Sequence, residues 1–191
     1  AGTNNPNGNG LVGTTPTFMT VPMVTQVADH LTAFGGFSGD DVVFVFGGNN
    51  DALTQFGLAA GGAISPEEAI AAVQAAATEL ATLVKSEIIA KGATRVAVLT
   101  LPDAAAAPLG ATLPDDAARG LLTQLFAQFN TTLLAGLNGS SARIISSEAV
   151  FASVRANPSA FGLTNINTPA CATTALSVSE SEVAYSDVRL D

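Results

Sequence analysis

The sequence is poor in the residues on which several large classes of protein depend. Lysine and arginine together number seven against sixteen aspartates and glutamates, so the net charge is −9. A protein that binds nucleic acid or an anionic membrane surface needs clustered cations to displace counterions from phosphates, and no such cluster occurs. We therefore expect no nucleic-acid partner.

Cysteine, histidine and tryptophan are nearly absent as well. Cys171 is the only cysteine, which excludes a disulfide within the chain, and no Cys/His spacing typical of zinc sites occurs. His30 is the only histidine, so any Ser-His mechanism within this chain would need it. It lies beside the apolar stripe of a short predicted helix, which favours a packing role over a catalytic one. We expect neither a metal nor a cofactor.

Long apolar runs are missing too. No stretch of about 18 apolar residues occurs, which predicts that no transmembrane segment is present. The first ten residues are polar and lack the basic start and apolar centre of a signal peptide, which is compatible with a mature or trimmed chain. Apolar residues nevertheless make up 48% of the 191 residues, enough for one domain with a sizeable core.

Helical and strand patterns alternate along the chain. Residues 21–36, 65–92, 115–139 and 148–162 have the spacing of helices, and 41–48, 93–102 and 142–147 are apolar runs typical of strands covered on both faces. The helix expected over residues 65–92 has a clear start, with Ser65 as N-cap, Pro66 in the first turn and Glu68 completing a capping box. Residues 51–63 contain several glycines and predict a loop, and the chain after residue 162 is irregular. This alternation predicts an α/β fold with a mainly parallel sheet and helices on both faces, a three-layer α/β/α arrangement.

The first predicted strand ends in an unusual group of polar residues. Gly47, Gly48, Asn49, Asn50 and Asp51 follow five apolar residues, at the carboxyl end of a strand, where ligands of α/β proteins collect. An asparagine amide there can donate to a developing oxyanion, and nearby glycines let backbone N–H groups approach the same atom. An Asx turn that merely ends the strand is the other interpretation.

Several segments resemble, in order, one family of enzymes. The block "GNND", residues 48–51, matches the Gly-x-Asn-Asp block of SGNH/GDSL-type serine esterases and lipases, and residues 20–51 are similar to the bacterial secreted branch. Three later segments are also similar to that branch: "VLTLPDAAAAPLG" (98–110), "FNTTLLAGL" (129–137) and "NPSAFGLTNINTPAC" (157–171). The resemblance implies an SGNH-hydrolase-like, flavodoxin-like fold over residues 1–191 as a single domain.

The resemblance also implies a chemistry and a set of site residues. It implies hydrolysis of a small-molecule or lipid carboxylic ester by a serine nucleophile, and a secreted, periplasmic or cell-surface location. Asn50 matches the asparagine of the oxyanion hole, and Gly2 is aligned with the glycine that also lines it. The aspartate of the Asp-x-x-His block corresponds to Asp191, with Asp187 as the alternative.

Two blocks of the family are not found in the chain. No Gly-Asp-Ser-Leu block occurs, and "FSGDD" (37–41) has its letters in the wrong order and position, so Ser38 is rejected as the nucleophile. No Asp-x-x-His block occurs either, and Cys171 lacks the family's second late cysteine. These departures predict a domain that is incomplete at both ends, whose nucleophile and base come from other segments of the same enzyme, on another chain or beyond this sequence.

The sequence bears on three other interpretations. A non-catalytic α/β binding or structural protein that has lost the triad would explain the missing serine and histidine. A nucleotide-binding domain is disfavoured because neither Gly-rich phosphate-binding motif occurs. A metal enzyme built on Asp40, Asp41 and Asp51 is disfavoured because adjacent acids before a strand are usually a solvated loop and no histidine supports them.

Overall fold

A computed structural model of the protein describes residues 21–168. Six α-helices, three strands and three short helical segments lie within this range. In chain order they are α1 (Met23–Phe34), β1 (Val42–Val45), α2 (Asn49–Ala60), α3 (Pro66–Leu83), the π-helix η2 (Val84–Ile89), β2 (Arg95–Leu99), η3 (Ala104–Ala106), α4 (Pro108–Ala111), α5 (Asp116–Leu137), β3 (Arg143–Ile145), α6 (Ser147–Ala156) and η4 (Pro158–Phe161).

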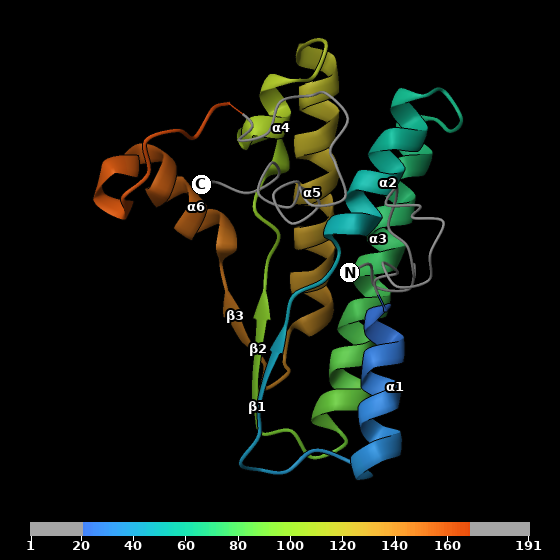
Figure 1. Ribbon diagram of the computed structural model, residues 1–191. Coiled ribbons are helices and arrows are strands. Elements are labelled where there is room, and N and C mark those ends of the chain that lie inside the picture. Colours follow the sequence, from blue (N-terminus) through green and yellow to red (C-terminus); the bar gives the residue numbers. More distant parts are fainter. Residues whose placement is uncertain (1–20, 169–191) are drawn as a thin grey trace, which may run out of the picture.

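The three strands form one all-parallel sheet in the order β1-β2-β3. Val45 lies opposite Val98, and Val98 lies opposite Ile144, so the register of all three strands is fixed near their carboxyl ends. The predicted α/β class and the parallel sheet are therefore confirmed. Figure 1 shows α1, α2, α3 and α5 together on one side of the sheet, while α6 and η4 lie on the other, which fits the predicted three-layer arrangement.

The core lies between one face of the sheet and helices α3 and α5. Val45, Val96 and Val98 are each at most 3% exposed and belong to the same hydrophobic cluster as the inner faces of the two helices. The helical residues are Ala69, Val73, Ala77, Leu80, Ala81, Leu122, Leu125, Phe126, Phe129, Leu133 and Leu137. Their spacing of three and four residues is the helical period predicted for residues 65–92 and 115–139.

The predicted helix starts are also confirmed. The Ser65 hydroxyl accepts from the Glu68 N–H at 3.2 Å, and the Glu68 carboxylate accepts from the Ser65 N–H at 2.7 Å, which is a complete capping box. Asp115 caps α5 by accepting from the Ala118 N–H at 2.8 Å. The long helix that begins at Pro66 changes to π geometry at Val84, a change that the sequence pattern did not predict.

The loop predicted for residues 51–63 is wrong, because Asn49–Ala60 forms helix α2. Gly57 in its interior disfavours a helix by about 1 kcal/mol relative to alanine. Burial offsets that penalty: Ala52 is fully buried, and Leu53, Phe56 and Ala59 pack on the core. Tertiary contacts with α3 and α5 therefore determine that this segment is helical, although its intrinsic helix propensity is weak.

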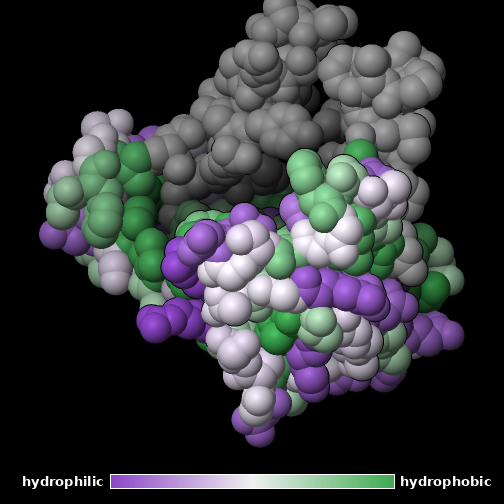
Figure 2. Space-filling model, turned by 90° about the horizontal axis from the view of Figure 1, so that it is seen from below, coloured by the Kyte–Doolittle hydropathy of each residue, from purple (hydrophilic) through white to green (hydrophobic). Residues whose placement is uncertain are grey.

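The second face of the sheet carries exposed apolar side chains. Val42 is 56% exposed and Phe44 is 66% exposed, whereas their neighbour Val45 is 1% exposed. Ile145, whose partner in the register is Leu99, also faces this side and is 38% exposed. Seen from below, hydrophobic surface gathers at the left of Figure 2, on the side where α6 lies in Figure 1. Because strands of parallel sheets are usually covered on both faces, this exposure is unusual for the fold.

Within residues 21–168, no helix has both the length and the hydropathy needed to cross a membrane. This agrees with the expectation that the chain has no transmembrane segment.

Candidate functional site

The polar group after β1 forms a sharp turn from strand to helix. Gly48 is the N-cap of α2 with φ 111°, a backbone conformation that residues with a side chain rarely adopt. A Cβ atom at this position would lie 2.1 Å from Cζ of Phe129, far inside van der Waals contact. Glycine is therefore required both by the backbone conformation and by the close approach of α5.

Asn50 lies in the first turn of α2, at the carboxyl edge of the sheet, as the sequence predicted. The side-chain amide of this half-buried residue makes no hydrogen bond to any other described residue, while its backbone carbonyl accepts from Thr54 Oγ1 at 2.7 Å. The first intrahelical bond runs from the Ala52 N–H to the Gly48 carbonyl at 3.0 Å, so the N–H groups before Ala52 point out of the helix end. An anionic oxygen is favoured at such an end by the helix dipole.

The neighbouring Asn49 has a different environment. Its Oδ1 atom is buried and has no hydrogen-bond partner among the described residues. A buried acceptor without a donor costs about 1–3 kcal/mol of stability. The hydrogen-bonding capacity of the turn is therefore not fully used by the described residues.

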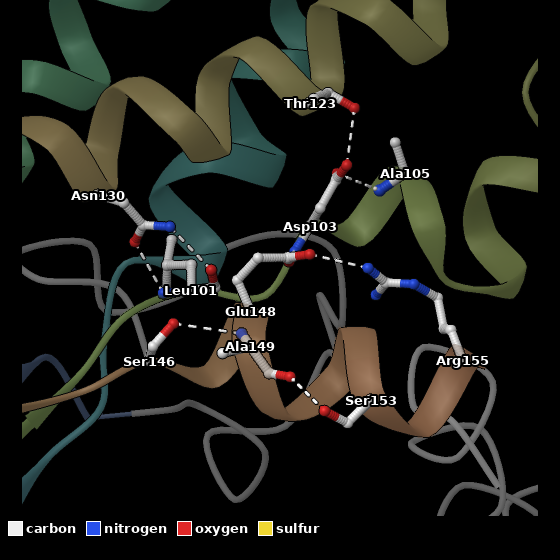
Figure 3. Close-up of polar contacts among 10 residues, drawn as sticks. All are labelled: Leu101, Asp103, Ala105, Thr123, Asn130, Ser146, Glu148, Ala149, Ser153 and Arg155. Carbon is white, nitrogen blue, oxygen red and sulfur yellow. Dashed lines mark hydrogen bonds and ion pairs between the residues drawn. The ribbon is translucent and has the colours of Figure 1, made fainter. Parts of the chain in front are cut away.

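The next strand along the sheet ends in a second organised turn, shown in Figure 3. Asn130 of α5 pairs with the backbone of Leu101, donating from Nδ2 to the Leu101 carbonyl and accepting from the Leu101 N–H, both at 2.8 Å. Asp103 accepts from the Ala105 N–H and from Thr123 Oγ1, each at 2.9 Å. Both carboxylate oxygens of Asp103 are therefore engaged in hydrogen bonds.

A hydrogen bond joins this turn to α6, and an ion pair within α6 holds the carboxylate that accepts it. The Asp103 N–H donates to Glu148 Oε2 at 2.7 Å, and Arg155 donates to Glu148 Oε1 at 2.8 Å. The pair is partly exposed, so its contribution to stability is small, on the order of 1 kcal/mol or less. The hydrogen bond from the Asp103 N–H to Glu148 fixes where the loop after β2 lies against α6.

His30 lies at the opposite end of the sheet from Asn50. Its ring stacks on Phe37 with centroids 4.2 Å apart, and its Nε2 atom lies 3.2 Å from the Gly36 carbonyl oxygen. These contacts agree with the packing role expected from the sequence.

A hollow of about 750 Å³ at this end brings His30 together with Ser38 and Asp41, an apparent serine–histidine–aspartate set. The hydrogen bonds are not those of a triad. Asp41 Oδ2 accepts from the Ser38 N–H at 2.7 Å, and Ser38 Oγ accepts from the Asp40 N–H at 3.2 Å. Since neither group is bonded to the imidazole, nothing here activates the Ser38 hydroxyl.

The sequence singled out two further groups of residues. Gly2, Asp187 and Asp191 lie outside the described residues, as does Cys171. Asp40 pairs with Arg95 at the surface, and no group of three or more possible metal ligands occurs in residues 21–168.

A second hollow, of about 640 Å³, lies between α2, α3 and α5 and is lined by Phe56, Pro66 and Leu121 among others. Neither of the two hollows includes Asn50.

The contacts of α5 with the two strand ends were missed from the sequence. One signal was present: Asn130 lies one position after a residue of the apolar stripe, in the middle of a long helix where asparagine is unfavourable. A mid-helix asparagine beside a core stripe indicates a tertiary hydrogen bond, but its partner cannot be read from spacing.

No protein-family model matches the chain, and a search of curated proteins gives no match either. The resemblance to SGNH/GDSL-type esterases therefore rests on the quoted motifs alone.

Proposed function

We propose that this chain forms the oxyanion-binding part of an SGNH/GDSL-type serine esterase or lipase. The observation that carries the proposal is Asn50. Its amide lies at the carboxyl edge of an all-parallel sheet, in the first turn of a helix, without a hydrogen bond to another described residue. The Gly-x-Asn-Asp match and the three later segments, in the same order as in the family, support it.

In this proposal the chain's own residues act on the charge that develops during acyl transfer. The carbonyl oxygen of an ester becomes negative in the tetrahedral intermediate, and the Asn50 amide and a backbone N–H from Gly2 donate to it. Donors fixed before the reaction are worth about 10²–10³ in turnover each. The nearby turn at Gly48 holds the backbone that carries Asn50, because Phe129 leaves no space for another position.

The nucleophilic serine and the histidine base are proposed to come from other segments of the same enzyme, in a secreted, periplasmic or cell-surface protein. Asp191, or Asp187, would orient that histidine. The exposed apolar face of the sheet, with Phe44 66% exposed, supports further covering segments. A hydroxyl without a positioned base is a weak nucleophile, so the chain by itself is expected to be inactive.

The test uses the protein isolated from its source with all attached segments. A fluorophosphonate probe that reacts with activated serines is added, and labelled peptides are identified by mass spectrometry. Labelling of a serine outside these 191 residues, together with turnover of p-nitrophenyl esters, is expected. Asn50→Ala in that complete enzyme should lower kcat about 10²-fold or more. An undiminished kcat in the variant would refute the proposal.

The alternative function is a non-catalytic α/β binding or structural protein. It is favoured by one observation, that neither hollow includes Asn50. It predicts no labelled serine and no ester turnover in any form of the folded protein. Labelling of Ser38 would point instead to the hollow that holds His30 and would contradict both functions.

A further inference from the structure

Two adjacent residues of α5 hold the ends of two neighbouring strands. The Phe129 ring occupies the space that a side chain at Gly48 would need, and Asn130 makes two hydrogen bonds to the backbone of Leu101. Phe129 is fully buried and Leu101 is 1% exposed, so both contacts lie in the interior. One turn of one helix therefore contacts the chain after β1 and the chain after β2.

The sheet register relates the two contacted segments. Val45 pairs with Val98. Gly48 lies three residues beyond Val45, and Leu101 lies three residues beyond Val98. The helix therefore contacts both chains at the same number of residues past the last pairing of β1 with β2.

Asn130 makes its hydrogen bonds beyond this last pairing, at Leu101. Its amide satisfies one donor and one acceptor of a buried backbone residue, as an additional strand would. Loss of the amide leaves both Leu101 groups unpaired in the interior, so the loop after β2 must move to reach other partners. A shift of the strand end relative to α5 alters the packing surface on which the Gly48–Asn50 turn lies.

We propose that Asn130 is a positioning residue for Asn50. Asn130 holds the end of β2 on the same turn of α5 whose Phe129 contacts the end of β1. The position of this turn of α5 thereby sets where the Asn50 amide points. This inference rests on the proposed function, in which Asn50 donates to an oxyanion. Displacement of a catalytic group by about 1 Å can cost on the order of 10²-fold in rate, so the contact matters even though Asn130 touches no substrate.

The test compares Asn130→Ala with a matched control on the same helix. Gln128 lies two residues before Asn130, and Gln128→Ala removes a partly buried hydrogen bond of 2.9 Å between Gln128 and Gln74 of α3, which involves neither strand end. In the complete enzyme, Asn130→Ala should lower kcat for p-nitrophenyl esters about 10-fold with KM changed less than 2-fold, because the oxyanion forms only after binding. Gln128→Ala should leave kcat unchanged.

A double variant tells positioning apart from a general loss of structure. If Asn130 acts through Asn50, Asn50→Ala combined with Asn130→Ala is no slower than Asn50→Ala alone. Asn130→Asp retains the acceptor for the Leu101 N–H and should have an intermediate kcat, which keeps the test usable if Asn130→Ala does not fold. Additive effects of the two alanine variants, or an unchanged kcat in both Asn130 variants, would overturn the inference.

Hydrogen exchange makes the inference testable apart from activity. In the 191-residue chain, Asn130→Ala should raise the exchange rate of backbone amides in residues 46–51 at least 5-fold over Gln128→Ala. If the complete enzyme is inactive but this difference appears, the proposed function fails while the coupling of the two strand ends stands. If the enzyme is active and residues 46–51 exchange equally in both variants, the positioning role is wrong.

Discussion

Substitution of Gly48 by alanine provides the sharpest test of the turn that carries Asn50. Two costs add at this position. Alanine at φ 111° is strained by about 1–3 kcal/mol. Its Cβ would lie 2.1, 2.5 and 2.6 Å from Cζ, Cε1 and Cε2 of Phe129, and forcing such an overlap in a packed core costs about 1–3 kcal/mol more. We expect Gly48→Ala to lower the free energy of unfolding by about 4 kcal/mol.

The assay is urea unfolding of the 191-residue chain, followed by far-ultraviolet circular dichroism. With an m-value of about 2 kcal/mol/M, a loss of 4 kcal/mol moves the midpoint by about 2 M. Gly57→Ala is the matched control, because Gly57 lies in the same helix with a negative φ and no atom within 4 Å of its Cβ position. That change should stabilise the chain by up to about 1 kcal/mol.

A double variant separates the two costs. Phe129→Leu removes the three ring atoms that the new Cβ would meet, so in its background Gly48→Ala should cost about 1–3 kcal/mol less. The backbone strain remains in both backgrounds. If Gly48→Ala costs less than 1 kcal/mol, or if Phe129→Leu gives no relief, the turn is not fixed in the way described.

Three further predictions follow from particular contacts. His30→Phe preserves the stack on Phe37 and should leave kcat of the complete enzyme within 2-fold of the parent, whereas a loss of 10² or more would make His30 a catalytic base. Ser65→Ala removes the capping-box hydroxyl and should destabilise the chain by about 1 kcal/mol in urea unfolding; a change below 0.2 kcal/mol would contradict the cap. Phe44→Ser changes a side chain that is 66% exposed and should shift the stability of this chain by less than about 0.5 kcal/mol, while a covering segment on that face would make the same change much more costly in the complete enzyme.

The main elements of the fold were predictable because each has a local pattern of apolar residues that is typical of a helix or a strand. The apolar stripes of α3 and α5 correspond to helix faces that are buried in the structure, whereas in the apolar run Val42–Val45 only Val45 is buried, and Val42 and Phe44 are exposed. Helix α2 was not predictable in the same way, since Gly57 and the glycines after Ala60 imitate a loop and the burial of Ala52 is visible only in three dimensions.

The candidate site also has a part that the sequence predicts and a part that it does not. The location of Asn50 follows from the sequence, because a covered strand that stops at glycine and asparagine places those residues at the carboxyl edge of a sheet. The contacts that hold this turn in place cannot be predicted from the sequence, because Phe129 and Asn130 are about 80 residues away in sequence from Gly48 and Asn50. Helical period explains why Phe129 is apolar, and nothing in the period shows that its ring lies against a glycine of another element.

The distribution of exposed and satisfied groups bears on whether this turn evolved for chemistry or for folding. A turn that served folding alone would be expected to satisfy its polar groups, as Asp103 does with two donors to its carboxylate. At the end of β1 the opposite is found among the described residues, since Asn50 donates to no described partner and the buried Oδ1 of Asn49 accepts from none. The two strand ends belong to one sheet and contact one helix, yet their polar groups differ in this respect. This difference favours a turn whose hydrogen-bond partners belong to a substrate or to another segment, which is the arrangement that an oxyanion-binding element requires.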